Sequence, residues 1–327
     1  TLWGWRRVED IRFGDRLGVA RHLPEPSPGV SWPEQALILL GHLVGDGSYV
    51  KRQPLRYTTA SEENSEAVRK AAESMGSVVT RHEGRGQWHQ LVISGNGNRW
   101  HPAGVGKWLK DLGIFGQRSR EKTLPEEIFQ LSGDQVALFL RHLWATDGSI
   151  TAARSGRVRI YFATASRYLA RDVADLLLRV GISARTKYVR HPGSEGWYTV
   201  DVSGARDQQV FLERVGKFGH SADAVREIRL KLQSASANTN VDTLPKEVFD
   251  YIRDRMRESG MTHRRMAALR GTSYGGSSHF SFSPSRETVM GYADLLDDEV
   301  LSGLASDDLF WDRVVSIEDA GEEPVYD

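Results

Sequence analysis

The chain repeats itself, and this duplication is the feature that most limits how it can fold. The segment LILLGHLVGDGSYV (37–50) has a counterpart in ALFLRHLWATDGSI (137–150), and both are apolar runs that end in Asp-Gly-Ser. Further similar pairs follow in the same order: 58–79 with 163–184, 88–95 with 197–204, 108–117 with 211–220, and 122–129 with 242–249. Ordered internal similarity of this kind indicates a duplicated structural unit. We therefore expect two halves of one fold.

The two halves share one predicted order of elements. An apolar helix ending at Asp-Gly precedes a strand in which basic and β-branched residues alternate. The clearest case is RVRIYFAT (157–164), with Val158, Ile160 and Phe162 on one face and Arg157, Arg159 and Tyr161 on the other. A helix with a serine N-cap follows, and then a hairpin around a Gly-rich turn and a short helix. We predict an α+β fold of two pseudo-symmetric αββαββα halves.

Glycines give the first apolar segment a packing face. Gly41 and Gly45 fall on one side of a helix, where glycine costs about 1 kcal/mol relative to alanine and so needs a packing reason. Close approach of the corresponding helix of the second half supplies that reason. Gly47 and Gly148, which follow the two helices, fit a left-handed residue that ends a helix.

Asp46 and Asp147 close the two predicted helices. A carboxylate at a helix C-terminus is poorly placed, because the helix dipole is negative there. A divalent cation relieves that repulsion, and carbonyl oxygens at the helix end can add ligands. Two such helices side by side bring the carboxylates together, which suits metal-assisted cleavage of a phosphodiester. The alternative is a plain Asp-Gly turn after a buried helix. Because the Asp-Gly motif ends the helix in both repeats, we favour a metal site.

Composition excludes several classes of protein. The 327 residues are enough for two domains. No apolar run reaches the roughly 18 residues of a membrane span, and TLWGWRRVED (1–10) has no apolar signal core. Because cysteine is absent, the chain has no disulfide, no cysteine zinc site and no thiol nucleophile. We expect a cytoplasmic protein, associated with the nucleoid when bound to DNA.

Charge is unevenly distributed although the net charge is zero. Residues 150–233 hold 15 Lys/Arg and 8 Asp/Glu, a net charge of +7, whereas residues 291–327 hold 1 and 12, a net charge of −11. A basic middle fits a surface that binds a polyanion. We expect the acidic end to point away from such a ligand.

The repeated segments resemble a known family. LLGHLVGDG (39–47) and LRHLWATDG (140–148) resemble the paired LAGLIDADG motifs of homing endonucleases. EKTLPEEIF (121–129) resembles the Lys-x-hydrophobic-Pro segment that precedes the second motif in inteins. The flanks GWRRVEDIRFGDRLGVARHLP (4–24) and WDRVVSIEDAGEEPVYD (311–327) resemble parts of an intein next to its endonuclease. The resemblance covers nearly the whole chain and is greatest with actinobacterial inteins of replicative DNA helicases.

The resemblance implies a site and a reaction. Asp46 and Asp147 would be metal-binding catalytic acids, the carbonyl groups of Gly45 and Thr146 secondary ligands, and Lys122 the cation near one scissile phosphate. Such enzymes cleave double-stranded DNA with metal-activated water, one strand per half, and leave short 3′ overhangs. The implied cofactor is Mg²⁺, with Mn²⁺ as a substitute. The implied target is a long duplex site in the helicase gene that lacks the intein, bound by a monomer with an internal pseudo-two-fold axis.

The second half departs from the family pattern. His142 replaces the first packing glycine and Thr146 the second small residue, and we expect His142 to be an interface histidine rather than a metal ligand. Asp242 stands at the position that matches Lys122, which leaves Lys231 as the substitute catalytic cation. The alternatives are therefore a strand-biased nickase and a DNA-binding protein that does not cleave. An RNA-splicing maturase is disfavoured by the intein-like flanks.

The predicted sheet faces supply candidates for contact with a DNA major groove. They are basic, amide or phenolic side chains on the hairpins: Arg56, Arg81, Arg85, Gln87, Arg154, Arg157, Arg159, Tyr161, Lys187 and Arg190. Taken singly, each fits an ordinary surface residue equally well. Outside the repeat, residues 245–271 resemble a helix-turn-helix that presents Arg264 and Arg265. That segment fits equally well as a small helical bundle that braces the splicing remnant.

We predict five segments along the chain. They are a splicing-domain remnant with a linker (1–30), the first half (31–132), the second half (133–250), a helical segment (251–306) and a second remnant (307–327). Protein splicing needs an N-terminal Cys or Ser, a Thr-x-x-His segment and a terminal His-Asn pair. None stands in the expected place, so we do not expect this chain to splice.

Overall fold

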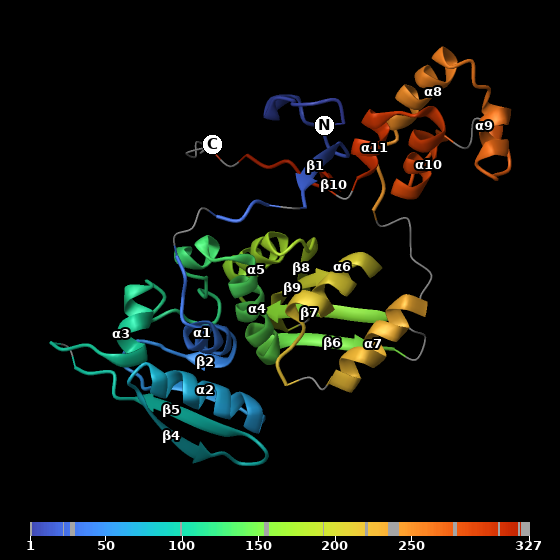
Figure 1. The fold of residues 1–327 in the computed structure, drawn as a ribbon. Helices are drawn as coiled ribbons and strands as arrows, with labels where there is room; N and C mark the ends of the chain where they lie inside the picture. Colours follow the sequence, from blue (N-terminus) through green and yellow to red (C-terminus); the bar gives the residue numbers. More distant parts are fainter. Residues whose placement is uncertain are drawn as a thin grey trace. The chain divides into compact units, whose positions relative to one another are not determined.

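Two compact units make up the chain. The computed structural model describes residues 2–21, 23–26, 30–98, 100–153, 157–191, 193–219, 222–234, 242–276, 280–306, 308–319 and 321. The larger unit is His22–Ala237, and the smaller unit combines Thr1–Arg21 with Asn238–Asp327 (Figure 1). The larger unit is therefore inserted, in sequence, between the two parts of the smaller one. Among the described helices, none has the length and apolar character needed to cross a membrane.

The first half of the larger unit is a four-stranded antiparallel sheet with helices. Its elements are α1 (Glu34–Asp46), β2 (Gly47–Ser48), β3 (Leu55–Thr59), α2 (Glu62–Ser74), β4 (Val78–Glu83), β5 (His89–Ser94), α3 (Gly104–Asp111) and the 3₁₀-helix η2 (Glu126–Gln130). The strands lie in the order β2-β3-β5-β4. Helix α2 packs on this sheet.

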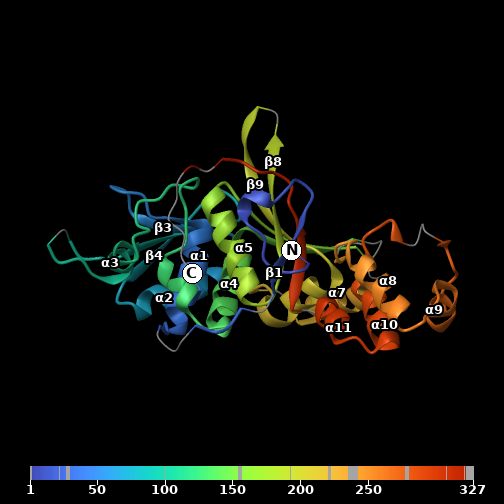
Figure 2. The ribbon, with the colours of Figure 1, turned by 90° about the horizontal axis from the view of Figure 1, so that it is seen from above.

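The second half repeats the same topology. Its elements are α4 (Gly133–Asp147), β6 (Gly148–Ala152), β7 (Val158–Thr164), α5 (Arg167–Arg179), β8 (Ala184–His191), β9 (Ser194–Val202), α6 (Ala205–Val210), the π-helix η3 (Phe211–Val215) and α7 (Ala222–Ser234). The strand order β6-β7-β9-β8 corresponds to that of the first half. Figure 2 shows the β8–β9 hairpin extending past α5. The predicted α+β class with two αββαββα halves is confirmed.

Local sequence signals explain why these elements form where they do. In β7 the alternation predicted from the sequence holds, because Val158, Ile160 and Phe162 are buried while Arg159 is exposed. The hydroxyl of Ser61 accepts a hydrogen bond from the backbone of Asn64 at the start of α2. Ser166 caps α5 in the same way through the backbone N–H of Leu169. These caps satisfy backbone donors that the first turn of a helix leaves unpaired.

Helices α1 and α4 lie side by side in the centre of the larger unit (Figure 1). A Cβ atom at Gly41 would lie 2.9 Å from both the Phe139 carbonyl oxygen and the Leu143 nitrogen, so the backbone of α4 leaves no room for it. At Gly45 a Cβ would overlap the side chain of Thr146. The glycines therefore permit a closer approach of the two helices than any side chain allows.

The glycines after the two helices do not adopt the predicted conformation. We expected left-handed residues, but Gly47 has φ −78° and Gly148 has φ −84°, both extended. Each continues directly into a strand, β2 or β6. The physical reason for glycine is close approach, because a Cβ at position 47 would overlap the Leu43 carbonyl and one at 148 the indole of Trp144. The chain thus reverses tightly against the last helical turn.

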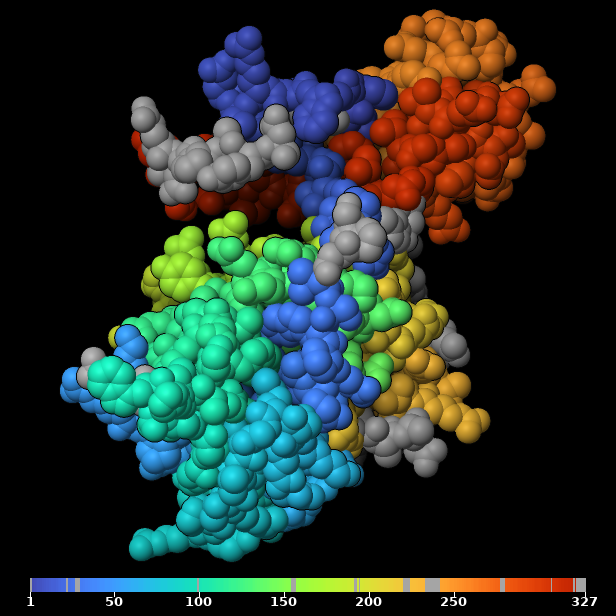
Figure 3. Space-filling model, turned by 60° about the vertical axis from the view of Figure 1, so that its left-hand side comes forward, coloured from blue at the N-terminus to red at the C-terminus, as the bar shows by residue number. Residues whose placement is uncertain are grey.

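The segment that leads into α1 lies on the surface of the larger unit, in blue in Figure 3. A carboxylate oxygen of Glu25 accepts a hydrogen bond of 2.9 Å from the backbone N–H of Gly133, at the start of α4. The side-chain amide of Gln135 donates to the Trp32 carbonyl at 2.7 Å. The entry to the first half is therefore fastened to the first turn of the second.

The smaller unit combines a two-stranded sheet with a helical cluster. Its elements are the 3₁₀-helix η1 (Val8–Asp10), β1 (Arg16–Ala20), α8 (Val248–Glu258), α9 (His263–Leu269), α10 (Arg286–Leu296), α11 (Glu299–Ala305) and β10 (Leu309–Arg313). β1 pairs with β10 in antiparallel register. α8 and α9 are joined by a turn at Gly260 (φ 65°) and Thr262 caps α9, which agrees with the helix-turn-helix order expected for residues 245–271. Phe249, Ile252 and Tyr292 belong to its separate core.

Replacing Gly41 by alanine tests the helix contact. We expect a loss of about 1–3 kcal/mol in the free energy of unfolding, because the added methyl group forces the backbones of α1 and α4 apart. Gly303→Ala is the matched control, since a Cβ there meets no atom within 4 Å. The control should gain up to about 1 kcal/mol from helix propensity. Urea unfolding measures both, and equal effects of the two changes would contradict the packing role.

Candidate active site and nucleic-acid interface

Asp46 and Asp147 are the last residues of α1 and α4. Both side chains reach solvent, yet each lies against enough protein for burial to raise its pKa. The pKa of Asp46 rises to about 6, first through burial and then through repulsion by Asp147, with Lys122 acting in the opposite direction. The paired helices therefore bring two carboxylates into electrostatic contact, as two like charges that share one site.

Lys122 binds the end of α1. Its side chain is buried, and Nζ donates to the carbonyl oxygens of Val44 at 2.7 Å, Gly45 at 2.6 Å and Gly47 at 3.1 Å. Burial lowers the pKa of Lys122 to about 8, although both carboxylates oppose this shift. The ammonium group thus satisfies carbonyls that the helix end leaves unpaired and sits beside the acidic pair. The Gly45 carbonyl, expected as a metal ligand, accepts a hydrogen bond from Lys122 here.

The backbone that carries Lys122 is held by the second half. The hydroxyl of Ser166 donates to the Lys122 carbonyl at 2.6 Å, and Ser166 is fully buried. One carboxylate oxygen of Asp172 accepts from the Thr123 hydroxyl at 2.7 Å and from the Leu124 backbone N–H at 2.8 Å. Ser166 is the N-cap of α5, and Asp172 lies within α5. The position of the Lys122 ammonium relative to the first helix end therefore depends on the second half.

The second half places a different lysine at its helix end. Nζ of Lys217 donates to the Gly148 carbonyl at 2.9 Å, and Gly148 corresponds to Gly47 in the repeat. Burial lowers the pKa of Lys217, as it does for Lys122. The sequence comparison missed Lys217, because it aligns this residue with Ile114. Lys231, the substitute that we expected, forms an ion pair of 2.6 Å with Glu227 along α7.

The structure explains why an aspartate, Asp242, stands at the position that matches Lys122. It lies in the smaller unit, where it forms ion pairs with Arg21 at 2.6 Å and Arg286 at 2.8 Å. The side chain of Arg21 is almost completely buried. The second Thr-Leu-Pro segment has thus become part of another core, which accounts for the carboxylate at the position that matches Lys122.

A histidine pair lies between the two helices. Nε2 of His42 and Nδ1 of His142 are 3.1 Å apart, and Nδ1 of His42 lies 3.0 Å from the hydroxyl of Tyr57. The ring of Phe218 packs on His142 with its centroid at 4.5 Å. Burial lowers the pKa of His42 to about 3 and that of His142 to about 4, so both rings are neutral at neutral pH. This chain of hydrogen bonds satisfies polar atoms in an otherwise apolar interface.

The donor set fits a divalent cation that also binds substrate. Across the described ranges, no group of three or more His, Cys, Asp or Glu side chains is arranged to hold a metal. The site therefore offers two carboxylates, with backbone carbonyls such as that of Thr146 beside them. Mg²⁺ is commonly held by one or two carboxylates together with water and substrate phosphates. The mutual repulsion of Asp46 and Asp147 is what such an ion would relieve.

The DNA-contact candidates of the first half lie on different faces. Arg56 pairs with Val92 in the sheet register, on the face opposite the buried residues of β3. Arg81 pairs with Leu91 on the side that α2 covers, where it forms ion pairs with Glu62 and Glu83 at 2.6 Å. Arg81 therefore lies on the opposite face of the sheet from Arg56, beside α2, although its side chain is exposed. Exposed Arg85 and Gln87 lie in the β4–β5 turn.

The candidates of the second half share one face of their sheet more closely. Arg159, Tyr161 and Lys187 lie on the face opposite the core, and Arg185 joins them by register although the sequence analysis missed it. The guanidinium of Arg159 lies 4.6 Å from the centroid of the Tyr161 ring. The remaining candidates are Arg157 and Arg190, which are exposed, and Arg154, which lies outside the described residues. In the smaller unit, Arg264 and Arg265 are exposed on α9.

A family model described as "LAGLIDADG-like domain" matches residues 33–100 and 134–216. The two matches fall on the two halves, each headed by one of the helices that carry Asp46 or Asp147. Both halves of the chain are therefore similar to the LAGLIDADG-like domain, in agreement with the resemblance found in the sequence.

The relatives include replicative helicases. The replicative DNA helicase DnaB of Nostoc sp. is 37% identical over 339 residues, which cover 100% of this chain and 38% of that protein. The DnaB of Rhodothermus marinus is 38% identical over 343 residues, with 100% and 36% covered. The RecA protein of Mycobacterium tuberculosis is 25% identical, with 94% and 42% covered. The chain thus spans about two fifths of the length of these relatives.

Solved structures of similar fold include the homing endonuclease I-DmoI in complex with DNA and Mn. It aligns with a TM-score of 0.41 at 16% identity and covers 57% of this chain and 98% of that chain. Full-length DUF199/WhiA from Thermatoga maritima aligns with a TM-score of 0.43 at 13% identity, with 85% and 93% covered.

Asp46→Asn should stabilise the folded chain in a pH-dependent way. The folded-state pKa of about 6 lies above the ordinary value of 3.8, so the wild-type chain loses stability as pH rises from about 4 to about 6. The asparagine side chain does not ionise, so the variant does not lose stability over this pH range. We expect a gain on the order of 1 kcal/mol at about pH 8, allowing for solvent screening, and none near pH 4. Urea unfolding at both pH values checks this, and an equal gain at both would contradict it.

Asp172→Asn should loosen the segment that carries Lys122, because it removes the charged acceptor of Thr123 and Leu124. We expect Lys122 to react severalfold faster with an amine-acylating reagent, measured by mass spectrometry of digested protein. Asp175→Asn is the matched control on the same helix, since Asp175 lies 3.8 Å from Arg171 on the exposed side. Unchanged protection of Lys122 in the Asp172 variant would show that Asp172 does not position this segment.

Proposed function

We propose that the chain is a sequence-specific, divalent-metal-dependent DNA endonuclease that hydrolyses one phosphodiester in each strand of a duplex. One observation carries this proposal: two carboxylates close two packed helices, where burial and the charge of Asp147 raise the pKa of Asp46, and a lysine binds the end of each helix. The arrangement occurs twice because the fold is duplicated. Two related centres correspond to the two antiparallel strands of a DNA target.

Each group has a distinct task in the proposed reaction. Asp46 and Asp147 hold the divalent cation, Mg²⁺ or Mn²⁺, which supplies Lewis-acid chemistry at the scissile phosphate when it is bound. The ammonium groups of Lys122 and Lys217 lie at the helix ends, where they offset the negative charge that develops on a phosphate. Arg159, Tyr161, Lys187 and related side chains on the open sheet faces bind backbone phosphates and base edges.

The two centres are chemically unequal, which supports unequal rates of cleavage of the two strands. Lys122 donates to three carbonyls and is buried, whereas Lys217 donates to Gly148 and is half-buried. A more exposed ammonium group is more strongly hydrated and stabilises a phosphate less. We therefore propose that the first-half centre cleaves faster, so that a nicked duplex accumulates before the double-strand break with 3′ overhangs.

The target follows from where the chain matches its relatives. It aligns along its whole length with a part of DnaB helicases, as an intein inserted in a helicase would. We propose that the substrate is a helicase gene without this insertion, cut by a monomer in the cytoplasm.

Incubation with a plasmid carrying an uninterrupted helicase gene tests the function. With Mg²⁺ we expect a double-strand break preceded by a nick, and with Ca²⁺ binding without a break. Asp46→Asn should reduce cleavage at least about a thousandfold while the Kd for the target changes little, because the carboxylate acts on the metal rather than on DNA affinity. Specific binding without any cleavage by the wild-type chain would favour a DNA-binding protein instead.

Strand-specific labels separate the two centres. Lys122→Ala should slow cleavage of one strand and Lys217→Ala that of the other, each by about ten- to a hundredfold. Lys231→Ala is the control, because its ammonium group is paired with Glu227 on α7. Equal slowing of both strands by Lys217→Ala would refute its assignment to one centre.

A further inference from the structure

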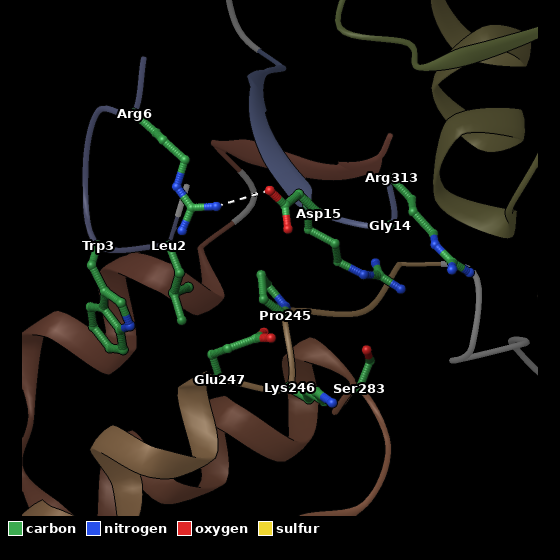
Figure 4. Close-up of a pocket in the computed structure, with 11 residues that line it drawn as sticks. Leu2, Trp3, Arg6, Gly14, Asp15, Pro245, Lys246, Glu247, Ser283 and Arg313 are labelled. Atoms are coloured by element: carbon green, nitrogen blue, oxygen red, sulfur yellow. Dashed lines mark hydrogen bonds and ion pairs between the residues drawn. The ribbon is translucent and has the colours of Figure 1, made fainter. Parts of the chain in front are cut away.

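A cavity of about 270 Å³ lies in the smaller unit, among the N-terminal segment, the start of β1, the residues before α8 and the end of β10 (Figure 4). Its charged lining consists of Arg6, Asp15, Arg16, Lys246, Glu247 and Arg313. These are four cations and two carboxylates, so the lining carries an excess of positive charge. Ser283 adds a hydroxyl group on the side of Lys246 (Figure 4).

Two of these cations oppose each other directly. Arg16 and Arg313 are partners in the antiparallel register of β1 and β10. Like charges in directly opposed positions of a strand pair are destabilising. Arg16 is half-buried, and its guanidinium donates to the carbonyl oxygens of Thr243 at 3.0 Å and Trp311 at 3.3 Å. Burial, followed by the charge of Arg313, lowers the pKa of Arg16.

The nearby carboxylates offset the charge of this pair only in part: Asp312, Glu247 and Asp242 raise the pKa of Arg16, but burial and Arg313 outweigh them. Asp15 is engaged by the Arg6 guanidinium at 2.9 Å and by the Arg12 backbone N–H at 2.9 Å. In the part of the chain that the structure describes, no ion pair joins Arg16, Lys246 or Arg313 to a carboxylate. Glu247 is exposed and faces the cavity from the start of α8 (Figure 4).

A glycine, Gly14, leaves space next to the Arg16–Arg313 pair. Gly14 has φ 90°, a conformation that side chains rarely adopt, and a Cβ there would lie 3.4 Å from the Arg313 guanidinium. The turn before β1 therefore brings backbone against Arg313 without filling the space. Guanidinium groups in such a setting match the oxygens of a phosphate, to which they donate paired hydrogen bonds.

We propose that this cavity binds a phosphate group, held by Arg16, Arg313 and Lys246 with the hydroxyl of Ser283 as a further donor. The group is either a phosphodiester of a DNA backbone or a free phosphate compound, since both present the same oxygens. This site is separate from the carboxylates of the larger unit and needs no metal. Its existence therefore does not depend on the proposed cleavage activity.

Thermal unfolding of the full chain without metal tests the site. Inorganic phosphate, compared with chloride at matched ionic strength, should raise the Tm of the wild-type chain by a few degrees. Arg313→Gln should lose this rise without lowering the Tm in chloride, because the substitution removes the repulsion on Arg16. Arg12→Gln is the matched control, since Arg12 is exposed in the same unit and does not line the cavity. It should keep the full rise.

Binding of a non-specific duplex, without metal, distinguishes the two sources of phosphate. If a DNA phosphodiester occupies the cavity, Arg313→Gln reduces the slope of log Kobs against log salt by about one and weakens binding about tenfold. If the slope is unchanged while the effect of inorganic phosphate on Tm persists, the ligand is a free phosphate compound. No change in Tm with phosphate, together with an unchanged slope, would overturn the proposal.

A second variant keeps the test decisive if Arg313→Gln does not fold. Lys246→Gln removes an exposed cation from the opposite side of the cavity and leaves the strand pair intact. It should reduce the phosphate-dependent rise in Tm by at least half. A full rise in a folded Arg313→Gln or Lys246→Gln variant, equal to that of Arg12→Gln, refutes the site.

Discussion

The contact between α1 and α4 is the constraint on which the larger unit depends. Gly41 and Gly45 let the two backbones approach until side chains of one helix meet the main chain of the other. That distance determines where both helices end, and so where Asp46 and Asp147 lie. The same contact buries the His42–His142 pair, whose neutral rings tolerate a dry interface. The apolar packing of α1 against α4 thus offsets the repulsion between the carboxylates at the helix ends. Functional sites are commonly destabilising in themselves and depend on the surrounding structure for their stability.

The first centre is shared by both halves. Lys122 serves the first helix end, but Ser166 and Asp172 of the second half hold the backbone that carries it. The connector that follows is fixed in the same way, because the Arg179 guanidinium donates to the carbonyls of Phe129 and Leu131. A duplicated gene product of this kind is no longer two independent copies. Substitutions on α5 are therefore expected to alter the position of Lys122 at the end of α1.

Features that repeat locally could be predicted from the sequence, whereas features set by tertiary contact could not. The alternation in β7 and the serine caps of α2 and α5 depend only on residues close together in the sequence, and the structure has them as predicted. Lys217 gave no such signal, because only the path of the chain after η3 brings it to Gly148. Arg81 shows the same limit, since strand register decides that it faces α2. The extended φ of Gly47 reflects the crowding of Leu43 rather than a turn preference.

The pairing of β1 with β10 has a consequence during synthesis. Arg16 leaves the ribosome before the larger unit, whereas its partner Arg313 follows only after the whole larger unit has been translated. Contacts between such distant residues form slowly, and domains that are continuous in sequence fold as they emerge. His22–Ala237 can therefore complete its core first, while β1 waits as an unpaired edge with Phe13 exposed beside it. A nascent chain of this topology needs protection of β1 until β10 has been translated.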